Sequence, residues 1–154
     1  MRVTSYTDYS LRVLMYVSLQ GDRLATIQEV ADRYRISKNH LMKVVHQLTR
    51  KGYLDSIRGK KGGIRLRMAS SDVNLGVLVR EMEPDLNLVE CFGPDNTCVI
   101  SPVCSLKGIL SEALEAFLAT LDRYTLSDLI SENNAPQLIR LLNIPVDEPG
   151  AETA

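Results

Sequence analysis

Two consecutive helical patterns joined by a short turn constrain the fold of this chain more than any other feature of its sequence. The first pattern begins at Thr26, which is followed three residues later by Glu29, the spacing of a capping box. The second covers residues 38–50, follows Ser37 as a good N-cap and ends before Gly52. Two short capped helices separated by about three residues are typical of a helix-turn-helix motif, whose second helix enters the major groove of DNA.

The second helix of this motif has two chemically different sides. Its apolar stripe consists of Leu41, Val44, Val45 and Leu48. The opposite side carries donors of the kind that contact base edges and phosphates, namely Asn39, Lys43, His46, Gln47 and Arg50. The sequence therefore predicts one side that faces the core and one that faces DNA. The candidate major-groove residues are Ser37, Lys38, Asn39, His40, Lys43 and Gln47.

A turn rich in glycine and lysine follows the motif and lies between two β-type runs. The runs are residues 53–57 and 64–68, and the second alternates apolar residues with Arg65 and Arg67. This alternation lets the apolar side chains lie on the helices while the arginines face outward. A basic hairpin after a helix-turn-helix is a wing whose tip can reach a phosphate or the minor groove. The candidate wing contacts are Arg58, Lys60, Lys61 and Arg65.

Charge is distributed very unevenly along the chain, although its net charge is −1. Residues 35–67 carry ten basic side chains and one acidic one, a net charge of +9, whereas residues 68–154 carry four basic and fourteen acidic ones. Such a basic block on an otherwise acidic chain is typical of a protein that binds a polyanion. The longest apolar run, residues 13–17, is far shorter than the roughly 20 residues of a membrane-spanning helix, and the N-terminus lacks the apolar core of a signal peptide. We therefore expect a cytoplasmic protein without a membrane partner.

Helical periodicity predicts one further helix on each side of the motif and hairpin. The first has Thr7 or Asp8 as its cap. Its predicted inward stripe is Leu11, Leu14, Met15 and Ser18. The fourth is capped near Asp72 and ends at Pro84. With the motif and the hairpin, these helices define a winged helix-turn-helix DNA-binding domain over residues 1–82.

The longest amphipathic pattern of the chain follows Leu106. Apolar residues recur there at helical spacing: Leu106, Ile109, Leu110, Ala113, Leu114, Phe117, Leu118 and Leu121. One interpretation is that this helix packs on its own domain. A winged-helix core is compact without it, however, so the stripe favours a two-fold homodimer that places two recognition helices on a palindromic operator. We expect this dimerisation helix and a closing helix capped by Thr125 over residues 105–134, then a largely disordered tail over 135–154.

All three cysteines of the chain, Cys91, Cys98 and Cys104, lie in a turn-rich loop over residues 83–104. Six residues separate the first two and five separate the last two, which differs from the two-residue spacing of zinc ribbons. Clustered cysteines in a cytoplasmic protein favour metal or redox roles over a structural disulfide. Three thiolates suit a soft metal or an iron–sulfur cluster. A zinc site and three ordinary cysteines remain the alternatives at this point.

Four stretches of the chain occur together in a characteristic order: TSYTDYSLRVLMYV, SKNHLMKVVHQLTRKGY, the wing RGKKGGIRL and the EMEPDLNLVECF lead-in to the cysteine loop. From residue 2 to 142 they closely resemble the NsrR type of nitric-oxide-sensing iron–sulfur repressors, which share a family with the IscR type. The resemblance implies a homodimer with one cluster per subunit, 4Fe–4S or, as the alternative, 2Fe–2S. The ligands that it implies are Cys91, Cys98 and Cys104.

The resemblance also implies a fourth ligand. In the NsrR type, a carboxylate near the start of the first helix of the other subunit completes the cluster, and the matching residue is Asp8. In the IscR type, a histidine three residues after the last cysteine has this role, and that position is Lys107 here. A carboxylate oxygen is a hard ligand on a soft cluster and is therefore weak, which favours that iron as the entry point for nitric oxide. A helix cap is the alternative role for Asp8.

The function that the resemblance implies is transcriptional repression relieved by nitric oxide. The cluster-loaded protein would bind operators near nitric oxide detoxification genes and release them on nitrosylation. The alternatives are a regulator of the same family that responds to iron–sulfur status or redox, and a zinc-stabilised winged-helix binding module. An enzyme is disfavoured, because no cysteine adjoins a usable histidine and no Gly-rich phosphate loop is present.

Overall fold

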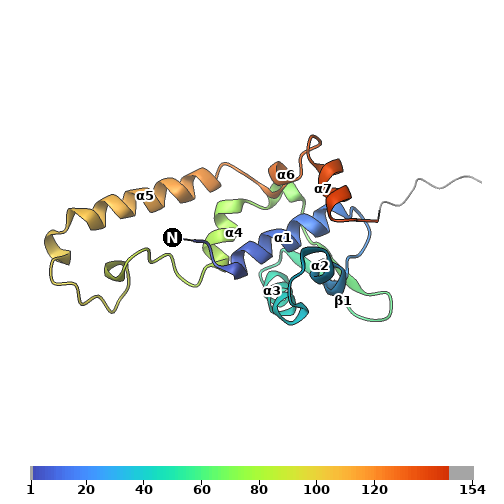
Figure 1. Ribbon diagram of the computed structural model, residues 1–154, viewed down its shortest axis with the longest axis horizontal. Coiled ribbons are helices and arrows are strands. Elements are labelled where there is room, and N and C mark those ends of the chain that lie inside the picture. The colour runs from blue at the N-terminus through green and yellow to red at the C-terminus, as the bar shows by residue number, and fades with distance from the viewer. Residues whose placement is uncertain (1, 146–154) are drawn as a thin grey trace, which may run out of the picture.

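The computed structural model describes residues 2–145, and residues 2–82 form a helical body with a two-stranded hairpin (Figure 1). The elements of the body are α1 (Ser5–Leu19), α2 (Ile27–Tyr34), α3 (Lys38–Arg50), β1 (Leu54–Ile57), β2 (Gly63–Leu66), the 3-10 turn η1 (Ser70–Asp72) and α4 (Leu75–Met82). Beyond it come the 3-10 turns η2 (Glu90–Phe92) and η3 (Ser101–Val103), the long helix α5 (Ser105–Leu121), α6 (Leu126–Leu129) and α7 (Ala135–Leu141). This order confirms the predicted fold class, mainly α with a small β-hairpin in a winged helix-turn-helix followed by a long helix.

Helix α1 is the central element of the body. It begins earlier than predicted, because the side chain of Thr4, and not that of Thr7 or Asp8, accepts the capping hydrogen bond. Of the predicted inward stripe, Leu14 is buried, Leu11 and Met15 are half-buried against the core, and Ser18 is half-buried. The buried residues of α1 are Thr7, Ser10, Val13, Leu14, Tyr16 and Val17. They occupy several sides of the helix because α3, β2, α4 and α6 all pack around it.

The helix-turn-helix follows the predicted boundaries. Thr26 and Glu29 form the predicted capping box, with the Thr26 N–H donating to the Glu29 carboxylate at 2.7 Å and the Glu29 N–H donating to the Thr26 hydroxyl at 3.1 Å. Arg35 adopts a left-handed conformation in the turn, with φ of 55°. Ser37 occupies the N-cap position of α3, although its side chain makes no capping hydrogen bond among the described residues. Gly52, with φ of 85°, ends the motif.

The hairpin packs on the helices through its apolar side. Leu54 pairs with Leu66 and Ile57 with Gly63 in an antiparallel register. Ile64 is buried and also exchanges two backbone hydrogen bonds with Ala25, at 2.7 and 3.1 Å, so the hairpin is joined to the segment before α2. The side chains of Arg65 and Arg67 are exposed, which confirms the predicted alternation.

Helix α4 completes the body. Its cap is Asn74, whose side-chain oxygen accepts from the Val77 N–H at 3.0 Å. This cap lies two residues after Asp72, near which it was predicted, and Asp72 itself belongs to the preceding turn η1. The helix ends at Met82, two residues before Pro84. The side chains that are buried most completely form one core under α1, α3, the hairpin and α4: Leu14, Tyr16, Leu41, Leu48, Leu54, Ile64 and Leu78.

Helix α5 extends away from this body as an arm, with the cysteine loop at its far end (Figure 1). Of its 17 residues only Leu118 is buried. Helix α6 begins at the predicted cap Thr125, which forms a capping box with Asp128.

The chain beyond α6 differs from the prediction of a largely disordered tail. Residues 135–141 form α7, because Ile139 and the following Leu142 and Ile144 pack against the core of the body. Residues 146–154 of the predicted tail lie outside the described residues. No helix within residues 2–145 is both long and apolar enough to span a bilayer.

Candidate nucleic-acid interface and candidate metal centre

The outer side of α3 and the wing form a shallow basic hollow of about 1110 Å³. Three of the predicted contact residues line it together: Lys43 and Gln47 from α3, and Arg58 from the end of the hairpin. The hollow also contains basic side chains that the candidate set omits: His46, Arg50 and Lys51. His46 and Arg50 belong to the polar side of α3 that the sequence pattern identifies. Helical periodicity is therefore a sufficient signal to include them among the candidate DNA contacts.

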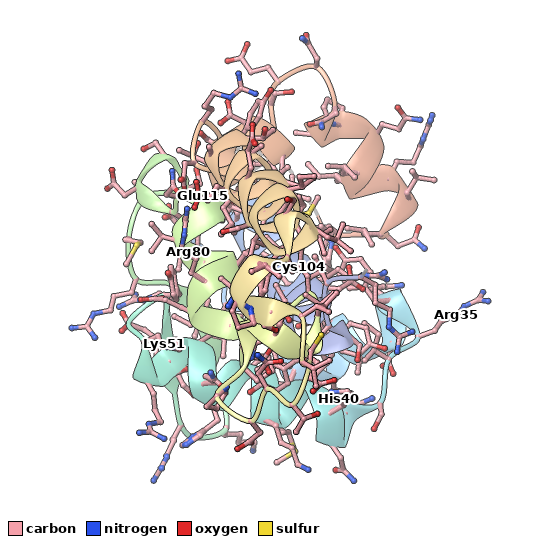
Figure 2. All side chains as sticks on the ribbon, turned by 90° about the vertical axis from the view of Figure 1, so that its left-hand side faces the viewer. Arg35, His40, Lys51, Arg80, Cys104 and Glu115 are labelled. Carbon is pink, nitrogen blue, oxygen red and sulfur yellow. The ribbon has the colours of Figure 1, made fainter. Side chains whose placement is uncertain are left out.

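Most of the predicted contact residues are exposed and can meet a phosphate. Ser37, Lys38, Asn39 and Lys43 are exposed, and so are Arg58, Lys60 and Lys61 at the wing. Among the described residues, Arg65 is the one member of the predicted set with an acidic partner, Asp55, at 3.7 Å. The basic side of the body therefore keeps a concentrated positive charge, which attracts a polyanion. Figure 2 shows Lys51 and His40 on this α3 side, below the arm that carries Cys104.

His40 differs from its neighbours in the predicted set because it is half-buried. Its ring lies 5.0 Å from that of Tyr9 in an edge-on arrangement and 6.3 Å from that of Tyr6. The Tyr6 hydroxyl also donates to the backbone carbonyl of Lys43 at 2.8 Å. The first turns of α1 are thus connected directly to the first turns of the recognition helix.

Asp8 lies in the first turn of α1, on the side of the helix that also carries Arg12. The Arg12 Nε donates to Asp8 Oδ1 at 3.1 Å, the Arg12 Nη2 lies 2.8 Å from Asp8 Oδ2 in an ion pair, and the Asp8 side chain is 43% exposed. Arg12 also lies over the rings of Tyr9 and Tyr34, at 5.9 and 5.7 Å from their centroids. Burial raises the pKa of Tyr34 to about 12, so its hydroxyl stays protonated at neutral pH. The Asp8 carboxylate is therefore held in orientation by Arg12 and remains accessible.

The cysteine loop is exposed, yet its first half is closed by hydrogen bonds. The Glu90 carboxylate accepts from the backbone N–H of Thr97 at 2.8 Å and from its hydroxyl at 2.7 Å. These bonds lower the pKa of Glu90. The side chain of Asn96 accepts from the Cys98 N–H at 3.1 Å and donates to the Ser101 hydroxyl at 2.9 Å. The two bonds between Glu90 and Thr97 enclose residues 91–96, so they close most of the segment that separates Cys91 from Cys98.

The three thiols are chemically suited to a soft metal, but the single chain does not gather them into a cage. Cys91 and Cys104 are half-buried, Cys98 is exposed, and none forms a disulfide. Within residues 2–145, no three or more Cys, His, Asp or Glu side chains lie close enough together to hold a metal ion. The donor set therefore fits an iron–sulfur cluster by its chemistry, while its closure needs rearrangement of the loop or a second subunit. Lys107 is exposed one turn into α5.

Comparison with known proteins identifies the family. The model of the Rrf2 family, described as an iron-dependent transcriptional regulator, matches residues 3–132. The HTH-type transcriptional regulator NsrR of Bacillus subtilis is 51% identical over 146 residues, which cover 94% of this chain and 99% of that protein. NsrR of Halalkalibacterium halodurans is 48% identical over 90% of this chain and 97% of its own length.

Solved structures show the same fold at low sequence identity. IscR from T. potens superimposes with a TM-score of 0.70 at 20% identity, covering 89% of this chain and 91% of that one. The oxidized form of Staphylococcus aureus CymR gives a TM-score of 0.65 at 21% identity over 96% of this chain and the whole of that one. Together with the helix-turn-helix, the wing and their basic surface, the family match and the NsrR relatives show that this chain belongs to the Rrf2 family, as a transcriptional regulator and not an enzyme.

Proposed function

We propose that this protein is a homodimeric repressor that binds a palindromic operator while it holds an iron–sulfur cluster, and that nitric oxide releases it from DNA. The observation that carries the proposal is the position of three free thiols on an exposed loop in a chain that matches a family of iron-dependent regulators. The sequence resemblance to the nitric-oxide-sensing branch of that family, with identities near 50% to NsrR proteins, supports the choice of effector.

The exposed arm supports a homodimer. The side chains of Leu106 and Ile109 are 58% and 61% exposed, although they belong to a continuous apolar stripe. The half-buried Leu114 and Phe117 line a groove of about 810 Å³. The groove lies between α5, residues 84–89 and the segment before α1, residues 2–4. A second copy of α5 would cover both the exposed stripe and the groove, and such burial is a main source of dimer stability.

In the proposed site, Cys91, Cys98 and Cys104 of one subunit and Asp8 of its partner hold the cluster. The bound cluster would supply iron that reacts with nitric oxide. Asp8 suits the role of a weak fourth ligand because its carboxylate is half-exposed and held in orientation by Arg12, with further lone pairs available. Asp8 is not the cap of α1, since Thr4 has that role, so the alternative interpretation of Asp8 as a helix cap loses its support.

The packing of α1 suggests how the state of the cluster would affect DNA binding. Thr4, at the start of α1, donates hydrogen bonds from its N–H and its hydroxyl to the Glu83 carboxylate, at 2.9 and 3.1 Å, and Glu83 is the first residue of the cysteine loop. One turn later, Tyr6 and Tyr9 contact Lys43 and His40 of the recognition helix. A change at Asp8 would therefore displace an element that touches α3 directly, and a rigid shift of both recognition helices would lower operator affinity.

The first test is spectroscopic. Protein purified without oxygen should be brown, bleach on titration with nitric oxide, and lose operator affinity in fluorescence anisotropy at the same stoichiometry. A colourless protein with one zinc per chain would overturn the cluster. A cluster that ignores nitric oxide and responds to oxidants would instead support a redox or iron–sulfur-status sensor of the same family.

A mixed dimer tests whether Asp8 acts on the other subunit. One subunit carries Asp8→Ala and the other Cys98→Ser. If Asp8 acts across the dimer, this heterodimer retains one complete site with the spectrum and nitric oxide response of the wild type, whereas either parent homodimer has none. If Asp8 acts within its own subunit, the heterodimer has no complete site. Asp22→Ala, another acidic position at the surface of the body, is the matched control.

A further inference from the structure

The base of the arm is held to the body by a compact polar joint, which we call the arm joint and define as Asn74, Gly76, Arg80 and Asp122. The Arg80 guanidinium donates two parallel hydrogen bonds to the Asp122 carboxylate, at 2.5 and 2.8 Å. Asp122 is the C-cap residue of α5, and Arg80 lies in α4. Fork-to-fork pairs of this kind fix relative orientation as well as distance. In Figure 2, Arg80 projects from α4 beside the arm.

Gly76 leaves the space on α4 in which the Arg80 and Asp122 side chains pair. A Cβ atom at this position would lie 1.9 Å from a carboxylate oxygen of Asp122 and 2.9 Å from the Arg80 guanidinium. Any side chain at position 76 would therefore displace the Asp122 carboxylate from its paired geometry. A glycine inside a helix costs about 1 kcal/mol relative to alanine. The space that Asp122 and Arg80 need explains why α4 has a glycine at this position.

Asn74 adds a second link at the same place. Its side-chain oxygen caps α4, while its amide nitrogen donates to the backbone carbonyl of Asp122 at 2.7 Å, which lies at the C-terminus of α5. The backbone continues this connection, because the Leu75 N–H donates to the Tyr124 carbonyl at 3.0 Å. The end of α5 is thus fixed to the start of α4 by both side chains and backbone.

The remainder of α5 has little packing of its own, so its direction depends on the joint. A helix of 17 residues is about 25 Å long, and a tilt of about 10° at its base moves its tip by about 4 Å. In a dimer formed through two arms, the same tilt would change the separation of the two recognition helices. The half-site spacing that a dimer accepts reflects that separation.

We propose that the arm joint sets the half-site spacing that this regulator accepts in its operator, and that Gly76, Arg80 and Asp122 are specificity-determining residues that act without touching DNA. The inference rests on the proposed arm-to-arm dimer on a palindromic operator. It does not depend on the cluster or on nitric oxide.

The test measures the spacing preference of full-length protein, purified without oxygen, by fluorescence anisotropy. The probes are duplexes in which two operator half-sites are moved closer or apart by one and two base pairs, together with a duplex that holds one half-site. The wild type should prefer one spacing by about tenfold or more over its neighbours, by analogy with the cost of a mismatched position. Arg80→Lys, Asp122→Asn and Gly76→Ala should each reduce this preference to about threefold or shift its optimum, with unchanged affinity for the single half-site.

The controls separate positioning from stability. Glu112→Gln changes one exposed charge of the same helix and should keep the wild-type optimum. The double variant of Arg80→Lys and Asp122→Asn should change the preference no more than either single variant, because both act through one contact. Arg80→Lys retains the charge and the helix propensity, so it remains informative if Gly76→Ala unfolds.

Two outcomes would overturn the inference. One is a set of folded, dimeric joint variants with the same optimum and the same preference as the wild type. The other is a wild type that shows no spacing preference, which would also remove the palindromic operator. Failure of the nitric oxide hypothesis would appear elsewhere, as a missing cluster or an unchanged operator affinity after nitric oxide, and would leave the spacing result intact.

Discussion

The body and the arm differ sharply in how completely they bury their apolar side chains. In the body, leucine, isoleucine and valine side chains of six elements meet in one core with almost no exposure. In the arm and its loop, Val99 and Val103 are 91% and 85% exposed, and α5 buries a single residue. Large exposed apolar surfaces in a folded protein usually mark an interaction site. The contrast supports the proposal that a second copy of the chain covers the arm.

The largest effect should come from truncating a leucine side chain in the body and comparing it with the same truncation in the arm. Leu41→Ala, in the completely buried stripe of α3, should lower the free energy of unfolding by about 2–5 kcal/mol, because it removes buried methyl groups and leaves a cavity. The measurement is denaturant unfolding at fixed protein concentration. Leu106→Ala in the arm is the matched control and should change the same quantity by about 0.5 kcal/mol or less in a dilute, monomeric sample. Equal effects at both positions would remove the contrast between the two regions.

A charge on the apolar stripe should break the dimer while leaving the body folded. Leu106→Glu combined with Ile109→Glu should weaken self-association by at least about a hundredfold, because two side chains worth about 1.5–3 kcal/mol each on burial are replaced by carboxylates. Sedimentation equilibrium measures the association, and circular dichroism should show unchanged helix content.

Ala119→Glu places the same charge on α5 outside the stripe and should leave the association nearly unchanged. If the stripe variant still forms the wild-type dimer, the exposed face of α5 has a different role.

The body follows from the sequence because its local signals agree with one another. Thr26 and Glu29 cap α2 as predicted, Gly52 ends α3, and alternation in the wing puts Ile64 inside and Arg65 outside. Each of these features depends on residues a few positions apart, so a linear pattern contains the relevant interactions.

Features that depend on distant neighbours could not be predicted in this way. The predicted inward side of α1 is incomplete because the helix is surrounded, so polar Thr7 and Ser10 are also buried among elements far away in sequence. Helix α7 was missed because its stability comes from packing of Ile139 on the body. The joint of Arg80 and Asp122 spans 42 positions and leaves no local signal.

The predicted DNA contacts allow a smaller effect to be measured in the body. Lys43→Ala should weaken operator binding by about tenfold and reduce the slope of log affinity against log salt by about 1, because one phosphate contact is lost. Lys43 is exposed, lines the hollow beside the wing and has no acidic partner among the described residues. Arg140→Ala, which removes an exposed charge from α7, is the control and should keep the salt slope. An unchanged slope for Lys43→Ala would remove this residue from the phosphate contacts.

The smallest effect concerns the loop, where exposure should not be equated with lack of structure. Glu90 accepts two hydrogen bonds from Thr97 and so closes the segment between Cys91 and Cys98. Glu90→Ala removes both bonds and should speed hydrogen exchange at the Thr97 amide by about fivefold, whereas Thr97→Val removes only the hydroxyl bond and should speed it by about twofold. Wild-type exchange at the rate of an unstructured peptide would contradict this closure. Exchange in the wild type that is slower than in an unstructured peptide would mean that the loop around Cys91 and Cys98 is already partly formed. Less conformational entropy would then be lost when the proposed site closes on the partner subunit.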